Sequence, residues 1–202
     1  QPGSADALAE RASATGVTGV QLALDPIRLG IMELSETRAR LREAGLQTVS
    51  GMMGMEGEDY SSLEAIRQTG GVMPDGTWAA NRRAAVELAR IAAELKLSLV
   101  TFHAGFIPHA PTDPRRSMLL ERLRVLAETY AERRVQVALE TGPETAATLS
   151  GVLDAVGGER IRVNFDPANL ILYGMGDPVA ALGALAPRVA QVHVKDALPA
   201  VR

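Results

Sequence analysis

The sequence contains no cysteine among its 202 residues. Disulfides, thiolate zinc sites, iron–sulfur clusters and cysteine nucleophiles are therefore excluded, and any metal must be held by oxygen and nitrogen ligands. Aromatic residues make up only 3% of the chain, and 21 basic residues stand against 24 acidic ones. Because a nucleic-acid binder normally needs a basic surface and stacking rings, we expect no nucleic-acid partner.

Long apolar runs are also missing. No stretch reaches the roughly 18 residues that a membrane span needs. The first residues, Gln1 to Ser4, lack the basic-then-apolar order of a signal peptide. We therefore expect a soluble protein without a membrane partner, and the absence of cysteine is typical of the reducing cytoplasm.

Strand-like and helix-like patterns alternate along the chain, which predicts βαβ units and a parallel sheet. Apolar spacing predicts helices around residues 5–12, 88–95 and 119–130, with Ser4 as a cap of the first. The predicted strands are Val17–Asp25, Leu46–Met53, Leu97–Ala104, Val135–Glu140, Ile161–Asp166 and Val189–Lys195.

Six strands are compatible with two architectures. One is an open doubly wound sheet, and the other is an eight-stranded (β/α) barrel whose first and last strands are not in this chain. A helix precedes the first strand, and only seven residues follow Lys195. No repeat or low-complexity tract marks a boundary, so residues 1–202 are interpreted as one domain that is truncated at both ends.

Polar residues on one face of the later strands favour the barrel. Parallel strands that are covered on both faces are normally apolar throughout. Here one face is apolar, as in Ile161–Asp166 with Ile161, Val163 and Phe165, or in the last strand with Ala190, Val192 and Val194. We expect these apolar faces to pack under helices. The opposite faces carry ionisable and amide groups toward the carboxyl ends, which in a barrel point inward.

Glu140, Asp166 and His193 stand at the ends of three successive strands and share this inward face. Buried carboxylates need a partner, and a divalent cation is the simplest one. Two carboxylates and one imidazole suit Mn²⁺, Mg²⁺ or Co²⁺, with Zn²⁺ or Fe²⁺ also compatible. Each residue also has a purely structural interpretation, as a helix start for Glu140, a turn or Asx cap for Asp166 and a core histidine for His193.

Two further histidines and one long loop complete the set of candidates. His103 shares the inward face of its strand and is interpreted as a substrate or metal-supporting residue. His109 is flanked by prolines and is expected to be an exposed loop residue. The connection from Gly51 to Gly76 carries a short amphipathic piece near residues 60–68, and it is either part of the site or a surface excursion.

Four segments together resemble a known family. They are Thr101–Pro108 (TFHAGFIP), Ala138–Gly142 (ALETG), Val163–Leu170 (VNFDPANL) and Val192–Asp196 (VHVKD). In their order and spacing they resemble the sugar phosphate isomerase/epimerase family of the xylose isomerase-like TIM barrels, over about residues 5–197.

The resemblance implies a site. In this family the matching Glu, Asp and His bind a divalent metal together with a second Glu from the eighth strand, for which this chain has no position. The matching residues are Glu140, Asp166 and His193. Lys195 and Asp196 are implied to lie near the substrate. Asn169 stands where ketose 3-epimerases carry a substrate-binding His; it is assigned to substrate binding here, although the contacts of that His do not transfer directly.

The implied reaction is a proton transfer next to a carbonyl through an enediolate, with Glu140 as base in a metal-dependent sugar isomerase or epimerase. Without the second carboxylate, we expect the 202-residue chain to be poorly active. No phosphate-binding Gly-rich loop is evident, which favours an unphosphorylated sugar or polyol as the partner, and family analogy allows a homo-oligomer.

Three alternatives stay open. The first is a metal-dependent dehydratase or lyase of a polyol or keto-sugar on the same barrel. The second is a catalytically silent sugar-binding barrel. The third is an apurinic endonuclease-like phosphodiesterase, which the few suitably placed histidines and the acidic sequence pI of about 5.7 disfavour.

Overall fold

The computed structural model describes residues 3–198. Its six strands form one parallel sheet in the order β1-β2-β3-β4-β5-β6. The strands are β1 (Gly19–Ala23), β2 (Gln47–Met52), β3 (Leu99–Phe102), β4 (Gln136–Glu140), β5 (Ile161–Phe165) and β6 (Val189–Val192). Each predicted strand is present. The prediction of parallel βαβ units is thereby confirmed, and the fold is an incomplete α/β barrel.

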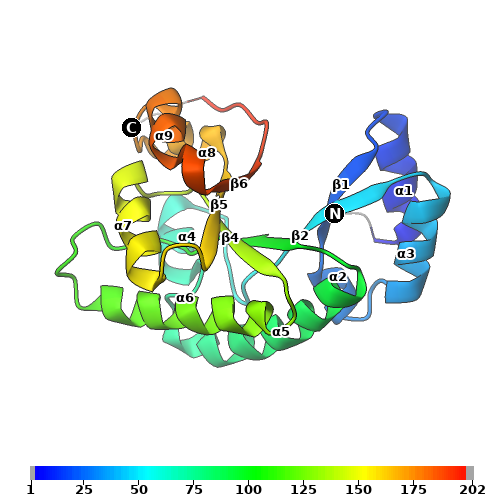
Figure 1. The fold of residues 1–202 in the computed structure, drawn as a ribbon, viewed down its shortest axis with the longest axis horizontal. Coiled ribbons are helices and arrows are strands. Elements are labelled where there is room, and N and C mark those ends of the chain that lie inside the picture. Colours follow the sequence, from blue (N-terminus) through cyan, green and yellow to red (C-terminus); the bar gives the residue numbers. More distant parts are fainter. Residues whose placement is uncertain (1–2, 199–202) are drawn as a thin grey trace.

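Helices connect the strands and cover one face of the sheet. They are α1 (Ala5–Ala14), α2 (Asp25–Arg28), α3 (Leu34–Glu43), α4 (Leu63–Thr69), α5 (Asp75–Glu94), α6 (Arg115–Ala131), α7 (Ala146–Val156), α8 (Pro167–Tyr173), α9 (Pro178–Leu185) and the 3₁₀ turn η1 (Ala186–Arg188). Ser4 caps α1 as predicted, because its hydroxyl accepts the N–H of Ala7 at 3.2 Å. In Figure 1, α5 and α6 run side by side below the sheet, and α1 packs on α3 at the opposite side from α7, α8 and α9.

The hydrophobic core lies between the sheet and these helices. Phe102 and Leu139 on the strands and Leu88, Leu123 and Tyr130 on α5 and α6 are almost completely buried. Their spacing explains the elements, since residues two apart on a strand share one face and residues three or four apart on a helix share another. The described residues thus bury one continuous core that holds the strand ends in place.

The inner face of the sheet is polar. Register pairs Gln21 with Ser50, Glu140 with Asn164, and Asn164 with Gln191, so these side chains stand in neighbouring positions across the strands. The sheet curves enough that Gln21 on β1 reaches both Thr101 on β3 and His193 beyond β6. The predicted polar interior is confirmed, and the carboxyl ends of the strands open on one side of it.

All six strands are one to three residues shorter than predicted at one or both ends, and the first and last show the reasons. The first strand ends at Ala23, and Asp25 begins helix α2 because Pro26 lacks the N–H that a strand would need and fits the first turn of a helix. The last strand ends at Val192, although the backbone N–H of His193 still donates to the carbonyl of Phe165 at 2.8 Å.

The expectation that the apolar face of the last strand packs under helices is also wrong. Val192 is 49% exposed and Val194 is 99% exposed, and Ala190 is exposed too. The physical reason is that β6 is an edge strand of the described sheet, paired only with β5, and the described residues place no helix over its outer face.

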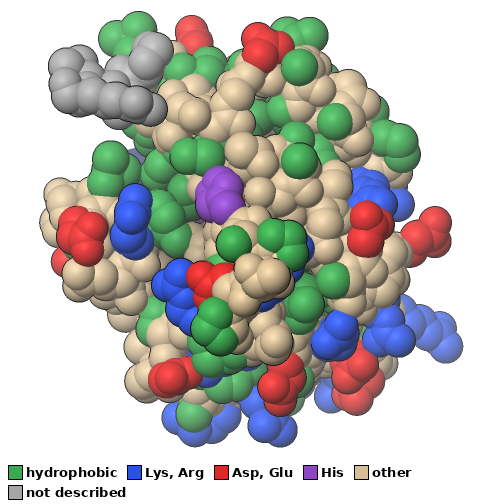
Figure 2. All heavy atoms as spheres, turned by 90° about the vertical axis from the view of Figure 1, so that its left-hand side faces the viewer, with side chains coloured by type: hydrophobic (Ala, Val, Ile, Leu, Met, Phe, Trp, Pro, Cys, Tyr) green, Lys and Arg blue, Asp and Glu red, His purple; other side chains and the backbone are tan. Residues whose placement is uncertain are grey.

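The surface carries charges of both signs. On the face shown in Figure 2, basic side chains stand beside acidic ones and are interspersed with apolar ones. Some oppositely charged side chains form ion pairs between separate segments, such as Arg160 with Glu128 and Arg188 with Asp154. Such exposed pairs contribute little to stability, about 0–1 kcal/mol each. The face in Figure 2 has no continuous basic patch. Within the described part of the chain, every helix is too short or too polar to cross a bilayer.

Candidate metal centre

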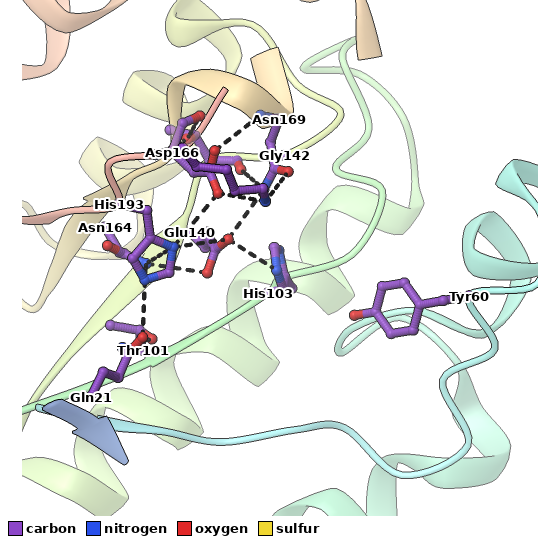
Figure 3. A network of polar contacts seen from close by, with 12 residues as sticks. Gln21, Tyr60, Thr101, His103, Glu140, Gly142, Asn164, Asp166, Asn169 and His193 are labelled. Carbon is purple, nitrogen blue, oxygen red and sulfur yellow. Dashed lines mark hydrogen bonds and ion pairs between the residues drawn. The ribbon is translucent and has the colours of Figure 1, made fainter. Parts of the chain in front are cut away.

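Glu140, Asp166 and His193 converge at the carboxyl ends of β4, β5 and β6 (Figure 3). One ligand atom from each side chain lies within 4.8 Å of the others. The Nδ1 atom of His193 is 3.4 Å from Oε1 of Glu140 and 3.6 Å from Oδ2 of Asp166. Ligand atoms of a cation bound at about 2.0–2.2 Å stand up to roughly 4.4 Å apart, so this spacing fits a divalent ion after small side-chain shifts.

Amide groups hold the Glu140 carboxylate from two sides. Asn169 Nδ2 donates to Oε1 and Asn164 Nδ2 donates to Oε2, both at 3.2 Å. Asn169 also donates to the backbone carbonyl of Thr141 at 2.9 Å. Asn169 therefore lies beside the predicted base and positions it, which the sequence pattern alone did not indicate.

Asp166 has both a structural and an electrostatic role in this cluster. Its Oδ1 accepts the N–H of Asn169 and caps α8, as the turn interpretation predicted, while Oδ2 accepts a hydrogen bond from Lys195 at 2.8 Å. The hydroxyl of Thr141 bonds both the N–H and the carbonyl of Asp166 and fixes its backbone. Burial alone would raise the pKa of Asp166, but the hydrogen bonds from Lys195 and from the N–H of Asn169, together with the charge of Lys195, outweigh it and lower the pKa.

The donors fit a cation on electrostatic grounds as well. Two carboxylates are almost completely buried within the same cluster, and the only Lys or Arg among the described residues that pairs with either is Lys195. In addition, Oδ1 of the buried Asn164 has no hydrogen-bond partner. Buried anions without enough cations are costly, and a divalent ion would offset that cost.

Gln21 is a residue of the site that the sequence reasoning missed. Its Nε2 donates to Thr101 Oγ1 at 2.9 Å, which turns its carbonyl oxygen toward His193 Nε2, also at 2.9 Å. In this arrangement Nε2–H of His193 donates to Gln21, and Nδ1 faces the two carboxylates (Figure 3). A single Gln in an otherwise apolar strand is the only signal that could have pointed to it.

Replacing Gln21 should therefore weaken metal binding. We expect Gln21→Leu to raise the dissociation constant for Co²⁺ about tenfold, because the imidazole loses the acceptor that fixes its orientation. The measurement is a Co²⁺ titration followed by absorption spectroscopy. Gln47→Leu, at an exposed position of β2, is the matched control and should leave the constant unchanged. Equal constants for all three proteins would contradict the role assigned to Gln21.

A cavity of about 250 Å³ adjoins the cluster. His103 lies in its wall, with Nε2 3.4 Å from Glu140 Oε1, which agrees with its predicted place beside the candidate metal ligands. Tyr60 from the long loop points its hydroxyl into the same region (Figure 3). Glu58 from this loop lines the cavity too. The connection between β2 and α5 is thus part of the cavity wall, and the short helix predicted within it is α4.

Of the other three candidate residues, Lys195 lies in the cavity wall, whereas Asp196 and His109 do not. Lys195 lines the cavity and donates to Asp166 and Asn169. Asp196 is exposed, accepts the N–H of Ala197 and is not among the residues that line the cavity, so its substrate contact stays a prediction. His109 is exposed in its loop, as expected, and contacts the carbonyl of Pro143.

Glu144 is a second residue of the cavity that the sequence reasoning did not single out. It follows β4 in the turn before α7, and its Oε1 accepts the N–H of Gly142 at 3.0 Å. Burial raises the pKa of Glu144 to about 7. An acid directly before a helix is common, so the sequence alone could not separate a buried carboxyl from a surface cap.

The six-stranded parallel sheet with carboxylates and a histidine at its carboxyl ends defines an incomplete (β/α) barrel with a candidate metal site. Residues 9–201 match the family model for the xylose isomerase-like TIM barrel. The chain therefore belongs to the xylose isomerase-like TIM barrel family. No curated protein matches the sequence significantly.

Solved structures agree with this assignment. A xylose isomerase domain protein from Planctomyces limnophilus is 31% identical, with a TM-score of 0.89, over 98% of this chain and 73% of that one. The 3-keto-D-glucoside 4-epimerase YcjR from E. coli is 17% identical, with a TM-score of 0.74, over 96% and 75%. A xylose isomerase-like TIM barrel protein from Mycobacterium smegmatis, solved with magnesium, is 17% identical, with a TM-score of 0.67, over 96% and 67%. The last two likenesses show the fold alone.

Proposed function

We propose that this protein is a divalent-metal-dependent sugar isomerase or epimerase that moves a proton next to a carbonyl. The observation that carries the proposal is the convergence of Glu140, Asp166 and His193 on one point beside a cavity of sugar size. The epimerase and the magnesium-bound protein among the structural relatives support the reaction class and the metal. Mn²⁺, Mg²⁺ or Co²⁺ suits this donor set best.

The chain's own residues supply the proton-transfer machinery. A bound divalent ion would polarise the carbonyl of the substrate and make the neighbouring C–H more acidic. Glu140 is the base that takes this proton, and Asn164 and Asn169 hold both of its oxygens in place. His103, 3.4 Å from the same carboxylate, donates to a substrate oxygen, and Lys195 and Asp196 lie on the side where the chain leaves β6.

The experiment that tests this function is isotope exchange. The complete protein is incubated with ketoses in ²H₂O with and without Mn²⁺, and deuterium at the carbon next to the carbonyl is followed by mass spectrometry and NMR. Metal-dependent incorporation is the expected result. Loss of water from the substrate would instead indicate the dehydratase alternative, and neither exchange nor loss across the ketose panel would contradict both reactions.

Metal binding should depend on pH. The pKa of His193 is raised, chiefly by its hydrogen bond to Glu140, so without metal its imidazole stays protonated to a higher pH than usual. A cation must displace the proton on Nδ1. The affinity of the protein for the cation should therefore rise as the pH rises toward and through the raised pKa of His193, and should then level off. Calorimetry in buffers of different ionisation enthalpy measures the released proton. An affinity that does not change between pH 5.5 and pH 8, chosen to bracket the usual pKa of about 6.5, would contradict this.

A further inference from the structure

Glu144 is a buried carboxyl that neither the metal cluster nor the proton transfer uses. Its exposed fraction is 3%, yet it lines the cavity. The N–H of Gly142 donates to Oε1, and among the described residues no Lys, Arg or His forms an ion pair with the carboxyl. Because its partners among the described residues are backbone N–H groups and no cation, the carboxyl can bond a further group, and the cavity that it lines is where such a group would lie.

The surroundings of Glu144 are aromatic and anionic. Tyr173 on α8 stands edge-on to Phe106 with ring centroids 6.0 Å apart, and both rings line the cavity. Burial, followed by the charges of Glu144, Glu140 and Glu58, raises the pKa of Tyr173. The remaining titratable groups of this cavity wall are Tyr60, His103 and Lys195, and His109 contacts the backbone of Pro143 next to Glu144.

The cavity holds little free positive charge. Three carboxylates line it, and Lys195 is the one Lys or Arg among its lining residues. The ammonium group of Lys195 already donates to Asp166 at 2.8 Å and to Asn169 at 3.2 Å. A phosphate group carries about −1.5 to −2 charges at neutral pH and needs Arg, Lys or clustered backbone N–H groups to bind. Lys195 is therefore not free, and a further cation, Arg67, stacks on the ring of Phe106 in the cavity wall, 5.0 Å from its centroid.

We infer that Glu144 hydrogen-bonds a hydroxyl of the substrate at a point of the cavity outside the metal cluster, and that the site thereby selects an uncharged sugar over its phosphorylated form. This inference rests on the proposed function for its substrate class. A carboxyl group can accept from a sugar hydroxyl when ionised and can also donate to it when protonated. The raised pKa of Glu144, which burial causes, makes both states available near neutral pH.

Calorimetry on the complete Mn²⁺-loaded protein with D-fructose and D-fructose 6-phosphate tests the inference at pH 8, where the carboxyl is largely ionised. The wild-type protein should bind the neutral ketose at least tenfold more tightly. Glu144→Leu should weaken that binding about tenfold, the equivalent of one hydrogen bond. Glu144→Gln, which keeps the shape and a hydrogen-bonding group, should restore it to within about threefold and reduce the discrimination against phosphate.

Glu87→Gln on the exposed face of α5 is the control for general charge effects and should change neither constant. Equal or tighter binding of the phosphorylated sugar by the wild-type protein would overturn the inference without any need for a variant. So would an absence of D-fructose binding, or Glu144→Leu binding as tightly as the wild type.

Deuterium exchange separates this inference from the proposed function. If D-fructose binds with the expected dependence on Glu144 but no ketose of the panel takes up deuterium, the proposed reaction fails and the role of Glu144 stands. If deuterium enters the sugar while the phosphorylated form binds equally well, the inference fails and the reaction stands.

Discussion

Glu140→Gln should lower metal-dependent deuterium incorporation at least about 10³-fold. Removing a general base alone costs about 10²–10⁴-fold, and this substitution also removes one of the two carboxylates of the candidate metal site. The amide of the variant places an N–H₂ group beside Asn164 or Asn169, both of which now donate to the carboxylate, so the side chain also loses its fixed position. The measurement is the initial rate of isotope exchange at saturating Mn²⁺.

The matched control for this prediction is Glu87→Gln, which removes one carboxylate from the exposed surface of α5. Its exchange rate should equal that of the wild type. A Co²⁺ titration of Glu140→Gln should in parallel show weaker binding. An exchange rate for Glu140→Gln within about tenfold of wild type would remove Glu140 from the role of base, whatever the metal does.

Gly71→Ala should destabilise the fold by roughly 3 kcal/mol or more. Gly71 has a φ of +71°, and a Cβ atom there would lie 2.1 Å from the backbone carbonyl of Ala104 and 2.2 Å from the nitrogen of Gly105. The two backbones cross at this point, and the N–H of Val72 donates to the carbonyl of Ala104 at 3.1 Å. Because backbone cannot rotate away as a side chain can, the overlap forces the segments apart.

Urea denaturation of Gly71→Ala and Gly158→Ala separates this overlap from simple backbone strain. Gly158 has a similar φ of +65°, but a Cβ atom added there would meet nothing within 4 Å. Gly158→Ala should therefore cost only about 1–2 kcal/mol, the usual penalty for a left-handed alanine. Equal losses of unfolding free energy for the two variants would show that the overlap with the backbone of Ala104 and Gly105 adds nothing to the strain of a left-handed alanine. Because Ala104 follows His103, the Gly71→Ala variant should also disturb the cavity wall.

The sequence determined the alternation of strands and helices and the identity of the residues that form the candidate metal site. Apolar and polar residues alternate along β4 and β5, and side chains of parallel strands alternate between faces by geometry. Glu140 and Asp166 could therefore be assigned to one face without coordinates. The outer face of β6 is apolar as well, and it is exposed because β6 is an edge strand of the described sheet.

Only the tertiary structure brought in Gln21 and Glu144. Gln21 lies 172 positions before His193, and the curvature of the sheet, which no local pattern encodes, brings the two to 2.9 Å. Glu144 likewise shares the cavity wall with Tyr173 of α8 and with Glu58 from the connection after β2, segments that lie far apart in the sequence. Local spacing fixes which way a strand residue points, whereas contacts between distant segments, and the burial they cause, arise only when the whole chain packs.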